Sequence, residues 1–408
     1  MSDFCRRTLL LSVLSVALIT GIRGQEPPGQ ALPNLIRGNE RFGRTLLEHV
    51  HRRAPDRNVV VSPISVSIIL AALQSSSEYG EIRKEVGKAF GWGENPNLDV
   101  PSRMLLVAFE KPDPPRTQTP KVDPRFRELP EAAWISNAVV YRGHGTLSER
   151  FISAAEKYYG MTFSSTGPAT PTQADIRRSR ESAGALPSTN PLNDVVISSG
   201  THLRTAWSGN TFALSKPYQG EFETASGQPK LVKMLTSEAT TYRYAKTERF
   251  EAVVLPCNRA YMLAVLPAPG QSILDLEREL AASPVAIDAA LKPHAGTVAM
   301  PPFHIQVETD LRQQIEEIGV RQVFKDLGSI VKIPASRLTE IRQKVDIQVD
   351  GIGIRADAET VGGAIYGGVA FVADPFRMEI NRPFLFLIRD QTTDALLFLG
   401  AVVDPSLN

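Results

Sequence analysis

The chain has 408 residues, with 45 basic and 44 acidic side chains, so its formal net charge is close to zero. This balance provides no electrostatic attraction to nucleic acid or to anionic lipid, which argues against a general nucleic-acid-binding protein. Hydrophobic residues make up 42% of the sequence, enough for a large core. With only two cysteines, Cys5 and Cys257, a disulfide framework and a structural zinc site are excluded.

The N-terminus has the pattern of a secretory signal peptide. Arg6 and Arg7 precede an uncharged, mostly apolar run over 9–22, and Gly24 stands before a polar stretch. The run is too short to cross a bilayer comfortably, although an uncleaved anchor is the alternative. We therefore expect residues 1–24 to be removed, residues 25–408 to form one domain, and the protein to be secreted or periplasmic, with no membrane contact after cleavage.

Apolar periodicity predicts the secondary structure in chain order. Helical patterns occur at 42–50, from Ser148 to Gly160, from Ser272 onward, and from Thr309 to Gly319. Strand patterns occur at 59–61, 134–141, 195–203, 241–244, 252–255, 261–266, 384–388 and 396–403. Proline-rich and polar stretches at 111–130 and 164–191 are predicted surface excursions of the same domain. Helices early and strands late indicate an α+β fold with large mixed or antiparallel sheets.

Motifs of common enzymes are missing from the sequence. There is no Gly-x-Ser-x-Gly elbow, no His-Glu-x-x-His spacing and no phosphate-binding loop of the Walker type. The six histidines follow no metal-ligand pattern. We therefore expect no enzyme activity, no metal and no cofactor.

The C-terminal stretch carries the most specific resemblance to a known family. Asn381-Arg382-Pro383-Phe384 continues through Leu385-Phe386-Leu387-Ile388-Arg389-Asp390 to Leu397-Phe398-Leu399-Gly400 and Val403-Asp404-Pro405, and this resembles the C-terminal hairpin of the serpin family. The segment from Asn58 to Ser65 resembles the strand and helix start of the serpin shutter region. Shorter matches follow in family order across the mature chain: Glu81-Ile82-Arg83, Asn137-Ala138-Val139, Trp207 with Phe212, Leu311, Gly319-Val320 and Val323-Phe324.

This resemblance implies one serpin-like domain with three β-sheets, about nine helices and an exposed reactive-centre loop at about 351–377. Inhibitory family members are suicide substrates of serine proteases. The protease cleaves the loop and forms an acyl-enzyme, and the freed loop then inserts as a new strand into the main sheet. The resemblance also implies a shutter formed by Asn58, Ser62, Ser65, Ser199 and Gln343. A non-inhibitory, binding or chaperone-like protein of the same fold is the alternative.

Residues after Gly353 alternate as an inserting strand requires. Ile354, Ala356, Ala358 and Thr360 form the set that could be buried, while Arg355, Asp357 and Glu359 could face water. The same pattern also fits an ordinary amphipathic edge strand or hairpin. Our predicted hinge consists of Gly353, Ile354, Ala356, Ala358 and Thr360.

Two counts place the scissile bond differently. Counting from the hinge gives Gly367 with Tyr366 beside it, and counting back from Pro383 gives Val372, with Phe371 as the nearby large side chain. No Lys or Arg occurs between Arg355 and Arg377, so a trypsin-like target is disfavoured. We expect a monomer that inhibits a serine protease of chymotrypsin-, elastase- or subtilisin-like specificity. The plain signal peptide and absent disulfides suit a bacterial exported protein.

Four positions or pairs depart from the family pattern. Gly351 stands where the family usually has Glu, and Asp357 and Glu359 stand in a run of small residues. Ser199 replaces the shutter asparagine and Gln343 the shutter histidine. Both substitutes are polar and could still bond with Ser62 and Ser65, but we expect the metastability that they tune to differ from that of the family.

Overall fold

The computed structural model describes residues 28–77, 80–93, 97–109, 132–141, 147–165, 195–212, 216–283, 285–327, 330, 337–338, 341–356 and 375–407. The predicted signal peptide, the 111–130 stretch and residues 166–191 lie outside these ranges. The described helices are α2 Pro28–His51, α3 Pro63–Ser76, α4 Gly80–Phe90, α5 Asp99–Phe109, α6 Glu149–Tyr159, α8 Ile273–Ala282, α9 Val285–Ala290 and α10 Arg312–Ile318, with short 3-10 turns η2 Ser208–Asn210 and η3 Gln322–Phe324. None of these helices combines the length and the hydropathy that crossing a membrane requires.

The strands are joined by backbone pairing into two sheets. The ten-stranded sheet has the order β1-β16-β15-β9-β8-β7-β10-β6-β5, with β14 beside β10. Its strands are β1 Val59–Val61, β5 Tyr218–Glu223, β6 Pro229–Thr236, β7 Thr240–Lys246, β8 Phe250–Pro256, β9 Ala260–Pro267, β10 Lys292–Met300, β14 Phe376–Glu379, β15 Phe384–Asp390 and β16 Leu396–Val402.

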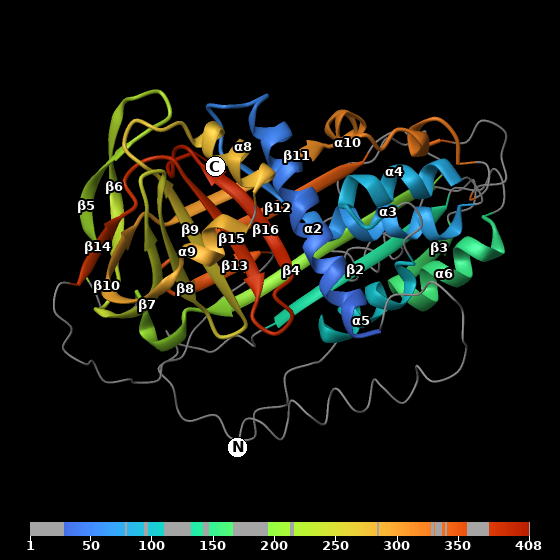
Figure 1. The fold of residues 1–408 in the computed structure, drawn as a ribbon, viewed down its shortest axis with the longest axis horizontal. Helices are drawn as coiled ribbons and strands as arrows, with labels where there is room; N and C mark the ends of the chain where they lie inside the picture. Colours follow the sequence, from blue (N-terminus) through green and yellow to red (C-terminus); the bar gives the residue numbers. More distant parts are fainter. Residues whose placement is uncertain are drawn as a thin grey trace, which may run out of the picture.

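The six-stranded sheet contains the longest strand and carries the candidate site. Its order is β11-β12-β13-β4-β2-β3. Its strands are β2 Ala132–Tyr141, β3 Met161–Ser165, β4 Val195–Ala206, β11 Phe303–Asp310, β12 Arg342–Val349 and β13 Gly353–Ala356. Figure 1 shows β2, β4 and β12 running along the length of the molecule, between the ten-stranded sheet at one end and helices α3 to α6 at the other.

The fold is α+β with mixed and antiparallel sheets, as predicted. The described residues form two separate paired sheets, of ten and six strands, and eight α-helices. The link between β6 and β10 consists of only two residue pairs, Ala299 with Thr236 and Met300 with Leu235. The β5–β6 hairpin is therefore joined to the rest of the large sheet by a short stretch of ladder.

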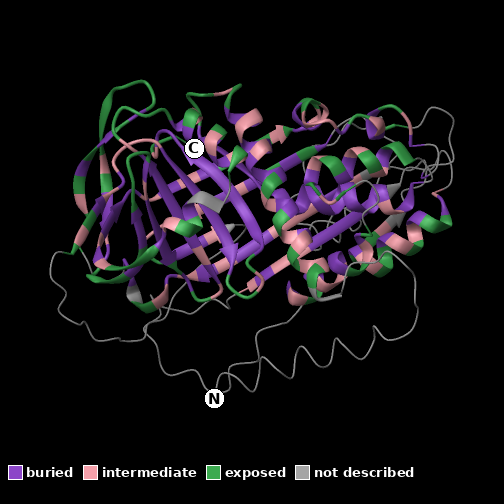
Figure 2. Cartoon of the chain, viewed as in Figure 1, coloured by how far each residue is buried: buried purple, intermediate pink, exposed green. Residues whose placement is uncertain are grey.

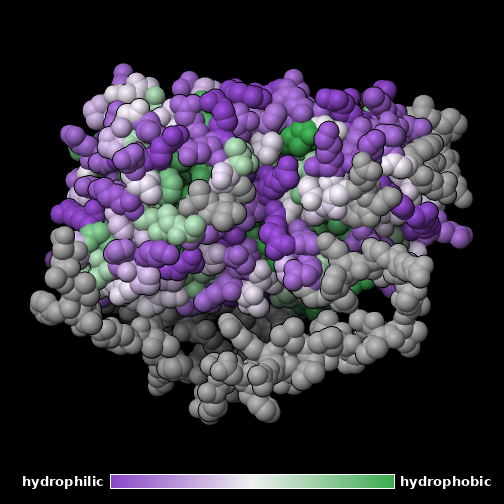
Figure 3. Space-filling model, in the orientation of Figure 1, coloured by the Kyte–Doolittle hydropathy of each residue, from purple (hydrophilic) through white to green (hydrophobic). Residues whose placement is uncertain are grey.

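Helix α3 is the centre of the helical part. Every residue from Pro63 to Ser76 except Ser75 is buried, and a helix that is apolar on all sides must be enclosed by other elements. Helices α2, α4, α5 and α6 and strand β4 all contact it. Figure 2 shows the resulting pattern: strands and inner helix faces are buried, and exposure concentrates on turns and outer helix faces. The face seen in Figure 3 is mainly hydrophilic, with apolar side chains in small groups.

Capping residues in the sequence predicted both ends of α6 correctly and the start of α10 incorrectly. Helix α6 follows Ser148, whose hydroxyl accepts a hydrogen bond from the Phe151 N–H at 3.2 Å, and it ends at Gly160 with a left-handed φ of +57°. These predictions are confirmed. The predicted helix start at Thr309 is wrong, because Thr309 lies in β11 opposite Gln343 and α10 begins at Arg312. Pairing with β12 outweighed the capping preference of Thr309.

A buried charge cluster joins α2 to the large sheet. Glu40 accepts hydrogen bonds from Arg44 at 2.5 Å and from Arg389 of β15 at 2.6 Å, and both arginines are nearly fully buried. Burial by itself raises the pKa of the Glu40 carboxyl, but the two guanidiniums outweigh that effect and hold its pKa below the usual value. Glu40 is thus the carboxylate that the two buried cations share, and Arg389 also lies 3.5 Å from Asp394 and 3.7 Å from Asp288.

Replacing Glu40→Gln should therefore lower the free energy of unfolding at pH 7 by about 3 kcal/mol, because two buried guanidiniums lose their common counter-charge. The native pKa of Glu40 is lowered, so its contribution is present at neutral pH and is lost as the pH falls below about 4 through the native value. Urea unfolding at pH 7 and in acid measures both effects. The control is Glu316→Gln in the partly exposed Arg312–Glu316 pair of α10, with an expected loss below about 0.5 kcal/mol. Equal losses at both sites would contradict the prediction.

Candidate functional site

The predicted hinge begins as a strand inside the six-stranded sheet. Strand β13 lies between β12 and β4 and is antiparallel to both. Ile354 stands opposite Val349 of β12 on one side and Thr205 of β4 on the other. Within the described ranges β12 and β4 have no pairing with each other, so these hinge residues separate two strands that would otherwise be neighbours.

Side chains along β13 alternate between the two faces of the sheet. Ile354 is fully buried, whereas Arg355 is partly exposed on the opposite face. A Cβ added at Gly353 would lie 2.2 Å from the Thr205 carbonyl oxygen and 2.8 Å from the Ala206 Cα, so only glycine allows the backbones to approach this closely. Ala356 is described only as backbone, and Ala358 and Thr360 lie outside the described residues.

Trp207 anchors the turn that connects β12 to β13. Its indole N–H donates to the Asp350 carbonyl at 2.7 Å, and its backbone N–H donates to the Ile352 carbonyl at 3.0 Å. Phe212 packs edge-on against the indole, with ring centroids 5.3 Å apart. Cys257, opposite Trp207 in an isolated bridge, is a buried thiol. The Trp207 and Phe212 matches in the sequence therefore correspond to contacts with the hinge turn.

A cluster of polar side chains joins the start of α3 to the six-stranded sheet. It consists of Ser62, Ser65, Thr201 and Gln343, and we call it the shutter cluster. The Gln343 amide accepts from the Ser62 N–H at 2.9 Å and donates to the Ser62 carbonyl at 2.8 Å and to the Ser65 hydroxyl at 3.0 Å. The Ser62 hydroxyl donates to the Thr201 hydroxyl at 3.0 Å. Gln343 thus bonds to both shutter serines, as its polarity allows.

Two residues of the predicted shutter, Asn58 and Ser199, form no hydrogen bond with the shutter cluster among the described residues. Asn58 binds the C-terminal segment instead: its amide N–H donates to the carbonyls of Asp404 at 2.7 Å and Leu407 at 2.9 Å, and its oxygen accepts from Val403 and Asp404 N–H groups. The buried Ser199 hydroxyl has no hydrogen-bond partner among the described residues. Thr201 was missed by the sequence analysis, although it lies two residues from Ser199 and strand alternation places it on the same face.

The chain that follows the predicted loop is fixed by aromatic contacts. Strand β14 runs parallel to β10, and the Phe376 ring stacks on Tyr244 with centroids 3.8 Å apart. Gly296 leaves room for this ring, since an added Cβ would lie 2.2 Å from it. Burial and a hydrogen bond to Glu251 raise the pKa of the Tyr244 hydroxyl, which therefore stays neutral. The scissile candidates Tyr366, Gly367, Phe371 and Val372 lie outside the described residues.

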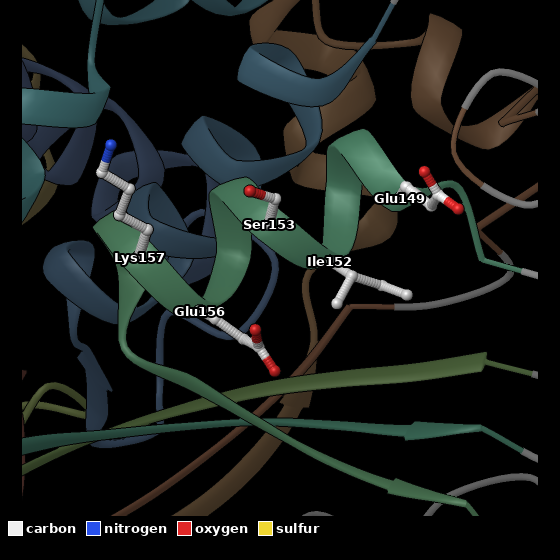
Figure 4. A pocket seen from close by; sticks show the side chains of 5 residues that line it. All are labelled: Glu149, Ile152, Ser153, Glu156 and Lys157. Carbon is white, nitrogen blue, oxygen red and sulfur yellow. The ribbon is translucent and has the colours of Figure 1, made fainter.

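A hollow of about 490 Å³ on α6 is not a convincing alternative site. Among the described residues it is lined only by α6 itself: Glu149, Ile152, Ser153, Glu156 and Lys157. Figure 4 shows Lys157 and Glu156 pointing away from each other. A binding site usually combines apolar walls with convergent polar groups from several elements, and this surface has neither.

Residues 37–405 match the family model described as Serpin (serine protease inhibitor). The chain belongs to the serpin family. Its relatives include Iripin-2 from Ixodes ricinus, 23% identical with 98% of this chain and 99% of that protein covered. Plasminogen activator inhibitor 1 from Mus musculus is 24% identical, with 89% of this chain and 91% of that protein covered.

Solved structures agree with the family assignment at the level of the fold. Cleaved Serpin 42Da has a TM-score of 0.74 at 18% identity, covering 92% of this chain and 99% of that one. Native protease nexin-1 with heparin has a TM-score of 0.72 at 18% identity, covering 92% and 100%. The chain therefore has the serpin fold. Serpins are inhibitors of serine proteases rather than enzymes, so the hinge and the loop that follows it are the candidate functional site.

Gln343→Leu tests the shutter cluster of this serpin. The variant leaves the buried Ser62 N–H without its partner and removes one of the two hydrogen bonds to the Ser62 carbonyl, which keeps the bond from the Ser65 hydroxyl. The free energy of unfolding should therefore fall by about 1–3 kcal/mol. Gln348→Leu is the matched control, because Gln348 lies on the same strand but on the partly exposed face. Chemical unfolding of both variants gives the comparison, and a loss at Gln343 no larger than at Gln348 would contradict this role.

Proposed function

We propose that this serpin is an exported suicide inhibitor of a serine protease with chymotrypsin-, elastase- or subtilisin-like specificity. The protease cleaves the reactive-centre loop, an acyl-enzyme forms between its serine and the loop, and the loop inserts into the six-stranded sheet before the ester is hydrolysed. The single observation that supports this most directly is the position of β13: residues 353–356, at the start of the predicted loop, are not exposed as the resemblance implied but already pair with β12 and β4 on their two sides.

The neighbouring strands offer ladder positions along which β13 could continue. In the described part of the chain, β4 pairs with β13 only over Leu203–Ala206, while its residues 195–202 pair with β2 alone. On the other side, β12 pairs with β13 over 347–349, and its residues 342–346 pair with β11 alone. Backbone groups on two facing strands are the requirement for adding a strand between them.

The composition of the loop supports the choice of target. An S1 pocket with a buried carboxylate needs a cation opposite it, and no Lys or Arg occurs between Arg355 and Arg377. Tyr366 and Phe371 suit an apolar pocket instead. The signal-peptide pattern of residues 1–24 supports export to a compartment where such proteases act.

Incubation with chymotrypsin, elastase and subtilisin tests the proposed function. We expect a band that survives denaturing electrophoresis at the summed mass of serpin and protease, because the acyl-enzyme ester is covalent. Mass spectrometry of the released C-terminal peptide then identifies the scissile bond among the two candidates. Cleavage by every protease without such a band would overturn trapping and favour the non-inhibitory alternative.

Ile354→Arg tests whether insertion is needed. The substitution buries a guanidinium at a position with no exposed surface, which opposes strand formation at the hinge. We expect this variant to be cleaved without forming the covalent complex. Ile352→Arg is the matched control, because Ile352 is 44% exposed in the adjacent turn, and it should still trap protease. Equal trapping by the two variants would contradict the proposed buried strand.

A further inference from the structure

Asp350 uses every one of its polar groups to hold the turn before β13. Its backbone N–H donates to the Gly353 carbonyl at 3.1 Å, and its carbonyl accepts from the Trp207 indole. Its Oδ1 accepts from the Ile352 N–H at 2.8 Å and from the Gly353 N–H at 3.2 Å. Its Oδ2 accepts from the Arg355 guanidinium. A single aspartate thereby fixes both the shape of the turn and the side chain that leaves it on β13.

Arg355 is held by an ion pair with Asp350. The Asp350–Arg355 ion pair is about four-fifths shielded from solvent, with side-chain exposures of 22% and 20%. The Asp350 carboxylate therefore compensates the charge of Arg355 at the point where β13 meets β4.

We propose that Asp350 and Arg355 form a latch that keeps residues 353–356 in the sheet of the intact serpin. This inference rests on the proposed function in one respect: the latch matters for inhibition only if the rest of the loop inserts behind β13. Insertion then extends a strand that already exists, and the cost of ordering its first residues is met before the protease arrives. Asp350 and Arg355 are positioning residues, since they act through the backbone of the loop and do not touch the protease serine.

Hydrogen–deuterium exchange on the intact, uncleaved protein tests the latch without any protease. Arg355→Gln removes the ion pair but keeps a polar side chain on a partly exposed face, so the fold should survive, as thermal unfolding will verify. We expect exchange of the 353–356 amides to accelerate at least about threefold, in keeping with the modest strength of a partly exposed ion pair. Arg355→Lys should restore most of the protection, and Arg312→Gln, which breaks a partly exposed pair in α10, should leave it unchanged.

Salt provides an independent measure. Exchange at 353–356 in the wild type should accelerate in 1 M salt, where screening acts over about 3 Å, whereas Arg355→Gln should show no such response. If Arg355→Gln exchanges at the wild-type rate, or if the salt response persists in it, the latch is refuted.

The consequence for inhibition is measured separately. In the presence of the protease that gives a covalent band, Arg355→Gln should be cleaved without complex formation in a larger share of encounters, at least about threefold above the wild type. If no protease forms a complex with the wild type, the proposed function fails while the exchange result still decides on the latch. If the wild type traps protease but the exchange rates do not differ, the latch fails and the proposed function stands.

Discussion

Pairing of one short strand with neighbours on both sides is the constraint on which the site depends. Strand β13 has only four residues, yet its backbone groups bond to β12 and to β4, so the separation of these two strands is fixed by the hinge. Gly353 allows the approach, Ile354 fills the core below the sheet, and Trp207 holds the turn. These three residues stabilise the site only while β13 is paired with both β12 and β4. If the pairing is lost on one side, buried backbone N–H and C=O groups lose their hydrogen bonds, which costs free energy.

The shutter cluster and the Asp350–Arg355 ion pair contribute to the six-stranded sheet in different ways. The shutter cluster is buried and satisfies its members among themselves, so it specifies how α3 meets β4 and β12. The Asp350–Arg355 pair lies at the end of the sheet, partly in contact with water. Buried amide–hydroxyl bonds respond little to salt, whereas a partly exposed ion pair is screened by it. The six-stranded sheet is therefore stabilised both by a hydrogen-bonded cluster that responds little to salt and by an ion pair that salt weakens.

Local patterns in the sequence predicted the elements whose signals are local. Ser148 and Gly160 delimit α6 because a cap acts within a few residues, and runs such as 262–266 identify buried central strands by composition alone. Strand β5 was not predicted, since its glutamates and glycine disguise a strand that buries only Gly220 and Phe222. The Thr309 helix start failed because pairing with Gln343 is a contact between distant segments. The same limit applies to the site. Alternation of side chains predicts that β13 is a strand, but only the fold shows that β13 lies between β4 and β12, which are far apart in the sequence. Thr201 was recognised as a member of the shutter cluster only from its hydrogen bond with Ser62.

The burial of β15 and β16 has a consequence for how the protein is made. Every residue of both strands is buried, and they lie between β1 and β9 in the interior of the large sheet. Asn58 then ties the residues beyond β16 to the start of β1. The middle of the sheet is thus filled by segments that leave the ribosome after nearly all the others, so β1 and β9 must wait with open edges until translation of the domain is almost complete. The large sheet is consequently completed only after β16 has been synthesised, and the exposed edges of the waiting chain are the surfaces that a chaperone would need to cover.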